Sequence, residues 1–189
     1  MWTLMLHLWD RWRFESPPAE RAWDLARGVE TRKWTLRGYE PVPLDTAAQI
    51  LAAVPRDGRT LIDVGCGKGR MLILAAEAGF SRVIGVEIDR WLCEVTRKNL
   101  AATGIDGVVV QQDARDWSWP TGPLTVFFYN PFDDPILGVV VSRLTDREPT
   151  GPVDVIYVNP LALHAFIDRG WTIASEGGSG TERWVWLTR

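Results

Sequence analysis

The residues with the clearest chemical potential lie between Leu61 and Arg70. This stretch is Leu-Ile-Asp-Val-Gly-Cys-Gly-Lys-Gly-Arg, in which an apolar run meets an acid, Asp63, and three glycines follow at alternate positions. Glycine takes backbone conformations that other residues avoid, and it lets a ligand approach without a Cβ. The stretch therefore predicts a strand, a ligand-binding loop and the start of a helix.

The spacing of these glycines distinguishes two kinds of ligand. A dinucleotide-binding loop has the pattern Gly-x-Gly-x-x-Gly. Here Arg70 stands at the third glycine position, and the last glycine comes one place earlier, at Gly69. Asp63, just before the loop, suits a ligand with an ammonium group better than one with phosphates. The pattern disfavours an NAD(P)-type oxidoreductase, which stays as the alternative.

Acidic and amide side chains follow other apolar runs along the chain. Glu87 ends the run from Val83 and lies 22 residues after Gly65, the interval at which an acid on the next strand meets a ribose. Asp113 follows the next run, and Asn130 follows the one after that. Because open α/β sheets bind ligands at the carboxyl ends of their strands, we expect these groups to meet at one edge.

The elements that must position these residues alternate between strand and helix after Arg59. Several candidate strands are continuous apolar runs, which is typical of strands covered on both faces. The pattern predicts a doubly wound, Rossmann-like α/β sheet of seven strands with an antiparallel last strand, because only a short glycine-rich stretch separates the last two. The expected strands are 60–64, 82–87, 108–112, 124–129, 154–158, 172–176 and 183–187, and the helices between them are 70–78, 90–103, 134–144 and 162–168.

N-terminal helices are expected before this alternation. Apolar residues recur at helical spacing in residues 2–12, and further helices are predicted at 18–27 and, with Asp45 as N-cap, up to Val54. The first of these helices could bind a membrane surface, a partner or its own domain. We favour its own domain over a membrane surface, since its polar face carries few Lys and Arg side chains.

Composition and charge exclude several classes of protein. The chain has 189 residues, 46% of them hydrophobic and 24% charged, and its net charge is −3. These values suit a soluble protein without the basic surface that binds nucleic acid. No apolar run approaches the roughly 20 residues of a membrane-spanning helix. We expect one domain over residues 1–189, with residues 1–59 as a helical cover and residues 60–189 as a cofactor-binding core.

Cysteine and histidine are scarce. Cys66 and Cys93 cannot build a disulfide framework and fit the reducing cytoplasm, and Cys66 lies between two glycines, where a small packing residue is needed. With His7 and His164 as the only histidines, no metal-ligand spacing arises, so no metal is expected. His164 is interpreted as structural rather than catalytic.

Together, these motifs resemble those of the class I S-adenosylmethionine-dependent methyltransferases. The matching stretches are Asp63–Gly69, Val83–Asp89, Gln112–Ala114 and Phe127–Phe132, within a similarity that runs from about residue 60 to residue 189. Tyr-Glu-Pro upstream, Gly-Lys-Gly-Arg in the first motif and Tyr-Asn-Pro-Phe in the fourth are most similar to a bacterial branch of the family without an assigned methyl acceptor.

The resemblance implies S-adenosyl-L-methionine as cofactor. By analogy with the family, Glu87 holds both ribose hydroxyls, Asp113 accepts from the adenine amino group, and Asp63 positions the amino-acid end. The cofactor-binding residues implied in this way are Asp63, Val64, Gly65, Cys66, Gly67, Gly69, Arg70, Glu87, Ile88, Asp113, Ala114 and Asn130.

The fourth motif implies where the methyl acceptor lies. Amino-group methyltransferases with Asn-Pro-Pro-Tyr or Asn-Pro-Pro-Phe hold the target amine there, but this chain has one proline fewer, Asn130-Pro131-Phe132. The candidate catalytic residues are Asn130 as a polar contact and Tyr129 and Phe132 as pocket walls; the alternative is that Asn130 caps the loop and Phe132 packs. We expect methyl transfer to a protein amine or a small molecule, with a non-catalytic cofactor-binding module as a second alternative.

Aromatic residues outside these motifs mark the parts around the core. Five of the 11 tryptophans precede residue 60, and the four motifs contain none. The Trp-rich amino terminus is therefore a candidate partner surface. Tyr39, in the Tyr-Glu-Pro segment, is expected to cover the methyl group of the cofactor.

Overall fold

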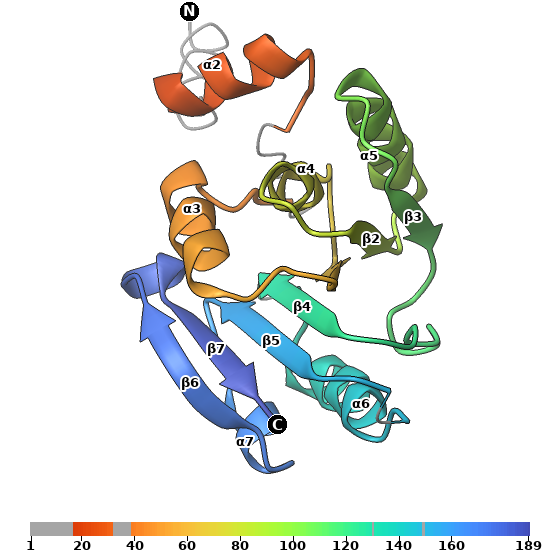
Figure 1. The fold of residues 1–189 in the computed structure, drawn as a ribbon, viewed down its shortest axis with the longest axis vertical. Helices are drawn as coiled ribbons and strands as arrows, with labels where there is room; N and C mark the ends of the chain where they lie inside the picture. Colours follow the sequence, from red (N-terminus) through yellow and green to blue (C-terminus); the bar gives the residue numbers. More distant parts are fainter. Residues whose placement is uncertain (1–16, 32–38, 130, 149) are drawn as a thin grey trace, which may run out of the picture.

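The structure is a computed structural model that describes residues 17–31, 39–129, 131–148 and 150–189. Seven strands form a single sheet, shown in Figure 1. The strands are β1 (Thr60–Val64), β2 (Arg82–Glu87), β3 (Val108–Gln111), β4 (Leu124–Tyr129), β5 (Val153–Val158), β6 (Thr172–Gly177) and β7 (Trp184–Thr188). The helices are α2 (Pro18–Arg27), α3 (Leu44–Ala53), α4 (Arg70–Glu77), α5 (Arg90–Ala102), α6 (Asp134–Thr145), α7 (His164–Ile167) and the 3₁₀ helix η2 (Gly180–Glu182).

The sheet has the strand order β3-β2-β1-β4-β5-β7-β6. Neighbours among β1 to β5 are parallel, and β7 is antiparallel to both β5 and β6. The chain builds outward from β1 to β3 and then returns to β4 on the other side of β1, so the strand order reverses between β1 and β4. Open α/β sheets bind ligands at such a reversal. The predicted fold class, a doubly wound seven-stranded sheet with an antiparallel last strand, is confirmed.

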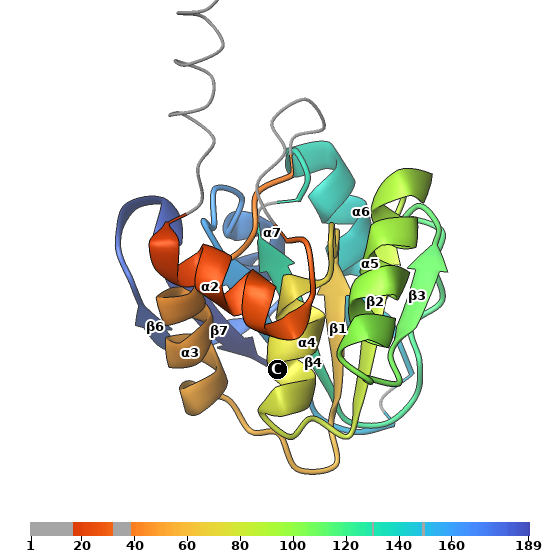
Figure 2. The same ribbon diagram turned by 90° about the horizontal axis from the view of Figure 1, so that it is seen from above.

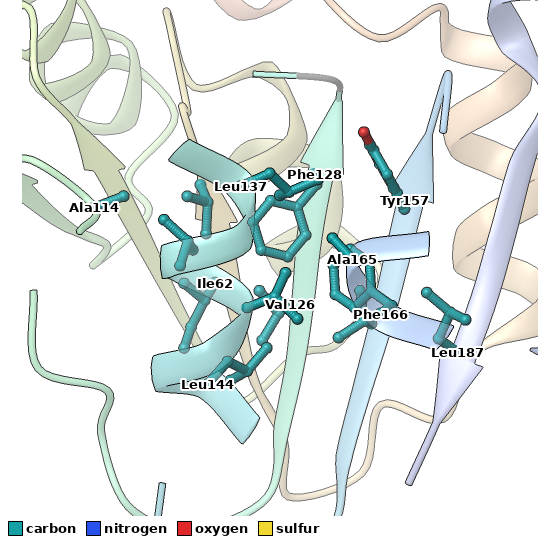
Figure 3. Close-up of a cluster of buried hydrophobic side chains, with 14 of the residues drawn as sticks. Ile62, Ala114, Val126, Phe128, Leu137, Leu144, Tyr157, Ala165, Phe166 and Leu187 are labelled. Atoms are coloured by element: carbon teal, nitrogen blue, oxygen red, sulfur yellow. The ribbon is translucent and has the colours of Figure 1, made fainter. Parts of the chain in front are cut away.

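Helices cover both faces of the sheet. In Figures 1 and 2, α3, α4 and α5 lie on one face with α2 outside them, and α6 and α7 lie on the other. Alternate strand residues enter separate hydrophobic clusters, as Leu61 and Ile62 of β1 do. Figure 3 shows the α6 and α7 side, where the ring centroids of Phe128 and Tyr157 lie 6.3 Å apart and each is 5.7 Å from that of Phe166. Strands buried on both faces explain the continuous apolar runs of the sequence.

The described part of residues 1–59 packs on the face that carries α4. The inner side of α3 contributes Ala47, Ile50 and Leu51 to the hydrophobic cluster that includes Leu61. Trp23 of α2 is partly buried against the same cluster. The two cover helices therefore share a core with the sheet. Among the described residues, no helix is long and apolar enough to cross a membrane.

Most predicted element ends agree with the structure to within two residues. The prediction that Asp45 caps α3 is wrong, because the helix begins earlier. The carbonyl of Pro43 already accepts from the amide of Ala47 at 2.9 Å, which makes Pro43 the N-cap and places Asp45 inside the first turn. The helix expected in residues 2–12 lies outside the described residues.

Candidate functional site

The carboxyl ends of β1 to β4 surround one cavity of about 490 Å³. It lies at the reversal of strand order between β1 and β4. Eight residues that the sequence singles out for cofactor or acceptor line it: Gly65, Gly67, Glu87, Ile88, Asp113, Ala114, Tyr129 and Phe132. Further lining residues include Tyr39, Glu40, Asp89, Gln112, Arg115, Pro131 and Ile136.

The loop after β1 brings bare backbone to the cavity. Gly65 and Gly67 both have left-handed backbone conformations, with φ of 79° and 55°. A Cβ added at Gly65 would lie 2.8 Å from the Cβ of Pro131, and one at Gly67 would overlap the ring of Tyr39. Both positions therefore require glycine for conformation and for close approach. A ligand in this cavity meets main-chain groups rather than side chains here.

Helix α5 holds this loop from behind. Thr96 Oγ1 donates to the carbonyl of Gly67 at 2.6 Å, and Asn99 Nδ2 donates to the carbonyl of Lys68 at 2.9 Å. Sequence analysis missed both residues, because a polar residue on a helix usually lies on the solvated face. Their signal is the spacing of three that places Thr96 and Asn99 on the buried side of α5, next to Leu100.

Two buried carboxyl groups lie beneath the loop. Glu87, at the end of β2, accepts from the backbone amides of Gly67 at 3.0 Å and Asp89 at 2.9 Å. Burial raises the pKa of Glu87 despite these amides. Burial, together with the charge of Glu87, raises the pKa of Asp63 to about 8. Of the two, Glu87 lines the cavity and can accept hydrogen bonds from a ligand there.

Asp113 is paired with Arg115 at the β3 side of the cavity. Its carboxylate accepts from the backbone amide of Arg115 at 2.9 Å and from the guanidinium Nη2 at 2.6 Å. These hydrogen bonds lower the pKa of Asp113 to about 2, so the group is ionised at neutral pH. Sequence analysis singled out Asp113 but not Arg115, since a charged residue in a loop carries no signal of its direction.

Aromatic and acidic side chains meet at the end of β4. Tyr129 is half-buried and, like Glu40 from the cover, lines the cavity. Burial raises the pKa of Tyr129 to about 12, and the charges of Glu40 and Glu182 act in the same direction. Phe132 packs partly buried against the cluster that contains α6. Asn130 lies outside the described residues.

The part of the chain that forms this cavity matches a known protein family. Residues 61–134, from β1 to the start of α6, match the family model described as a methyltransferase domain. That stretch contains the glycine loop and the strand ends of β1 to β4. Over residues 61–134, the chain is therefore similar to a methyltransferase domain.

Known methyltransferases match the chain over different lengths. The ribosomal protein L11 methyltransferase of Thermotoga maritima is 38% identical over 58 residues, which are 31% of this chain and 22% of that protein. The chain spans about a fifth of the length of the curated relatives it matches.

Solved methyltransferase structures share the fold. The magnesium protoporphyrin IX methyltransferase of Synechocystis PCC 6803 with bound SAM has a TM-score of 0.59 at 18% identity, over 77% of this chain and 78% of that one. The Pyrococcus abyssi tRNA (uracil-54, C5)-methyltransferase in complex with S-adenosyl-L-homocysteine has a TM-score of 0.58 at 19% identity, over 77% of this chain and 37% of that one. At these identities the likeness is one of fold.

Some residues predicted to contact the cofactor are not among those that line the cavity. They are Asp63, Val64, Cys66, Gly69 and Arg70. Cys66 Sγ fills the space above Gly85, where an added Cβ would lie 2.5 Å from the sulfur. Burial raises the pKa of the Cys66 thiol, as expected for a packing residue rather than a nucleophile. The guanidinium of Arg70 is hydrogen-bonded to residues of the cover.

The described residues were also compared for clusters of side chains that could bind a metal ion. Across residues 17–31, 39–129, 131–148 and 150–189, no group of three or more His, Cys, Asp or Glu side chains could hold a metal ion. His164 Nε2 lies 3.4 Å from Asp134 Oδ1, with both side chains more than half exposed. His164 does not line the cavity.

Proposed function

We propose that the protein binds S-adenosyl-L-methionine in this cavity and catalyses methyl transfer to an acceptor. One observation carries the proposal: the glycine loop, Glu87, Asp113 and the β4 end line one cavity at the reversal of strand order. The match of residues 61–134 to the methyltransferase domain supports it. A reduced nicotinamide cofactor is disfavoured by the glycine spacing, since Arg70 stands where a third glycine would pack.

The residues that line the cavity fit this cofactor. Gly65 and Gly67 leave room for a ligand close to the backbone. The carboxylate of Glu87 has about four acceptor positions, of which the amides of Gly67 and Asp89 use two. The backbone of Ile88 also acts on this carboxylate, and we assign the acceptor capacity that remains to the ribose hydroxyls. Asp113 would accept from the adenine amino group, sharing its carboxylate with Arg115.

The cofactor, when bound, supplies a methyl carbon made electrophilic by a sulfonium. The protein must then hold the acceptor in line with that carbon and keep water out. We assign Tyr129 and Phe132 to the wall of the acceptor site, with Tyr39 above the glycine loop. Asn130 as a polar contact to the acceptor stays a prediction from the sequence.

Among acceptors, we favour an amine, on a protein or on a small molecule. Glu40 lies in the cavity lining with Tyr129, and Glu182 acts on the same phenol. Negative charge at this point attracts a protonated amine and can take up the proton that the amine loses. The named substrate of the Thermotoga maritima relative is a ribosomal protein, which is consistent with a protein acceptor here.

Calorimetric titration with S-adenosylmethionine and S-adenosylhomocysteine tests the cofactor. We expect both to bind with micromolar affinity, Glu87→Ala to weaken binding at least about 30-fold, and NADH not to bind. The loss reflects the removal of hydrogen bonds from the ribose to a charged group, since even one is worth about 1.5–3 kcal/mol. A folded protein that binds neither sulfur compound would contradict the proposal.

A labelling experiment tests the transfer. The protein is incubated with methyl-labelled cofactor and native lysate, which is then separated into protein, RNA and small molecules. We expect label in the protein or small-molecule fraction. Cofactor binding with no label in any fraction would favour the non-catalytic binding module.

Three further proposals concern the whole chain. We propose that residues 1–189 form one domain, supported by the hydrophobic cluster that α3 shares with β1. We also propose a cytoplasmic location, supported by the buried free thiols of Cys66 and Cys93. Finally, we propose that the Trp-rich amino terminus is a partner surface; of its five tryptophans, only Trp23 lies in the described residues.

A further inference from the structure

Arg70 is the largest fully buried side chain among the described residues, with 1% of its surface exposed. It stands in the first turn of α4, directly after the glycine loop. Its guanidinium forms an ion pair with Glu20 at 2.9 Å and donates to Thr31 Oγ1 at 2.8 Å and to the carbonyl of Val42 at 3.1 Å. These partners all belong to the cover. A buried charge is retained only with such complete pairing, so Arg70 ties the cover to the loop.

Thr31 connects Arg70 to the cavity. It is fully buried, and its amide and hydroxyl donate to the carboxylate of Asp24 at 3.1 and 2.5 Å. Its carbonyl accepts from Arg70 Nη2 at 3.4 Å and from the hydroxyl of Tyr39 at 3.4 Å. The position of Tyr39 therefore depends on a residue that Arg70 and Asp24 hold from two sides.

Tyr39 is the point where this network reaches the cofactor cavity. Its ring lies against Gly67, so closely that a Cβ on that glycine would overlap it, and it lines the cavity. Burial raises the pKa of Tyr39, so its hydroxyl remains a donor to Thr31. The Lys68 ammonium lies 5.4 Å from the ring centroid. This part of the chain therefore contacts two regions. Gly65 and Gly67 line the cavity, whereas the side chains of Lys68 and Arg70 bind Glu30 and Thr31 of the cover.

We propose that Arg70 is a positioning residue for the cofactor, acting through Thr31 and Tyr39 rather than by direct contact. It fixes Thr31, and Thr31 fixes the Tyr39 ring over the glycine loop. Cofactor affinity therefore depends on a side chain that does not line the cavity. The proposal rests on the proposed function, because it assumes that S-adenosylmethionine binds there.

Titration of S-adenosylhomocysteine by calorimetry tests this coupling without any acceptor. The variants are Arg70→Gln, Tyr39→Ala and the double variant. We expect each single variant to weaken binding about tenfold. The double variant should weaken it no more than about 20-fold, because both changes disrupt the same interaction, the Tyr39 ring over the glycine loop. If the two side chains acted independently, their losses of affinity would multiply, and the double variant would bind about 100-fold more weakly. Such a multiplicative loss, or a folded Arg70→Gln variant with wild-type affinity, overturns the proposal.

Arg27→Gln is the matched control. The Arg27 side chain also joins α2 to α4, through Glu77 at 2.8 Å, and the hydrogen bonds described for Thr31 involve neither residue. We expect its affinity for S-adenosylhomocysteine to stay within twofold of the wild type. If Arg27→Gln weakens binding as much as Arg70→Gln, the effect is general loosening of the cover and the proposal is wrong.

A second pair of variants applies if Arg70→Gln does not fold. Thr31→Ser keeps the hydroxyl that bonds Arg70 and Asp24, and Thr31→Val removes it. We expect Thr31→Ser to bind like the wild type and Thr31→Val to lose about fivefold. Equal affinities overturn the proposal. If the wild type itself does not bind S-adenosylhomocysteine, the proposed function fails, and the proposal about Arg70 fails with it.

Discussion

Both faces of the sheet carry an apolar cluster, but the face with α4 also carries a network of buried polar groups. On the face covered by α6 and α7, the rings of Phe128 on β4 and Phe166 on α7 meet edge to face in an apolar cluster. On the other face, the cover is joined to α4 by buried polar groups, with Arg70 and Thr31 at the centre. Apolar packing tolerates substitutions of similar volume, whereas a buried ion pair demands one geometry. We infer that apolar packing on both faces contributes stability and that the polar network on the second face fixes the position of a cavity wall.

The largest effect is expected on the apolar face. Phe166→Ala removes a fully buried ring and leaves a cavity, so the free energy of unfolding should fall by about 3–5 kcal/mol. Chemical denaturation measures this loss. Affinity for S-adenosylhomocysteine should stay within about twofold in the folded protein. A large loss of affinity in Phe166→Ala would show that the α6 and α7 face also fixes the position of the cavity wall.

A smaller loss of stability is expected from the polar face, together with a loss of binding. Asp24→Ala leaves the buried amide and hydroxyl of Thr31 without their acceptor. Unfolding should be easier by about 1–3 kcal/mol, and S-adenosylhomocysteine should bind several-fold more weakly. Denaturation and calorimetry on the same sample give both quantities. Lower stability with unchanged affinity would mean that the network only supports the cover.

The pH dependence of stability gives a third comparison. Asp63 is buried on β1 and its pKa is raised to about 8. Between pH 4 and 8 the folded state therefore binds more protons at this group than the unfolded state, and stability falls as pH rises. The slope from one group is at most about 1.4 kcal/mol per pH unit.

The variant Asp63→Asn isolates this contribution. Relative to the variant, the wild type should lose stability steadily from pH 4 to 8 and show a constant difference above that range. Denaturation at five pH values measures the difference. Parallel profiles for the two proteins would show that the pKa of Asp63 is the same in the folded and unfolded states.

The smallest effect is expected at the rim of the cover. Arg27 and Glu77 form an ion pair with side chains 30% and 40% exposed. Solvent screens such pairs, so Glu77→Gln should change the free energy of unfolding by less than about 1 kcal/mol. A thermal unfolding series in low and high salt tests this. A loss of unfolding free energy as large as that of Asp24→Ala would show that the exposed ion pair also helps to fix the cover.

The apolar face and the strand ends could be predicted from the sequence for local reasons. The ends of β1, β2 and β4 follow from apolar runs that stop at polar residues, and Gly65 and Gly67 signal their own conformations. The partners of buried polar side chains could not be predicted in this way. Nothing near Arg70 in the chain indicates that its partner Thr31 lies 39 residues away, because that contact depends on how the cover packs. The sequence therefore predicts where the site lies better than what holds it.

The placement of β7 between β5 and β6 has a consequence for the order of folding. Among the described strands, β6 reaches the sheet only through its antiparallel pairing with β7, and β5 has no other neighbour on that side. During synthesis, β5 thus presents an open hydrogen-bonding edge until Trp184–Thr188 has emerged. Open edges are sites of mispairing between chains. The nascent chain is therefore most exposed to aggregation in the interval before its last described strand is made.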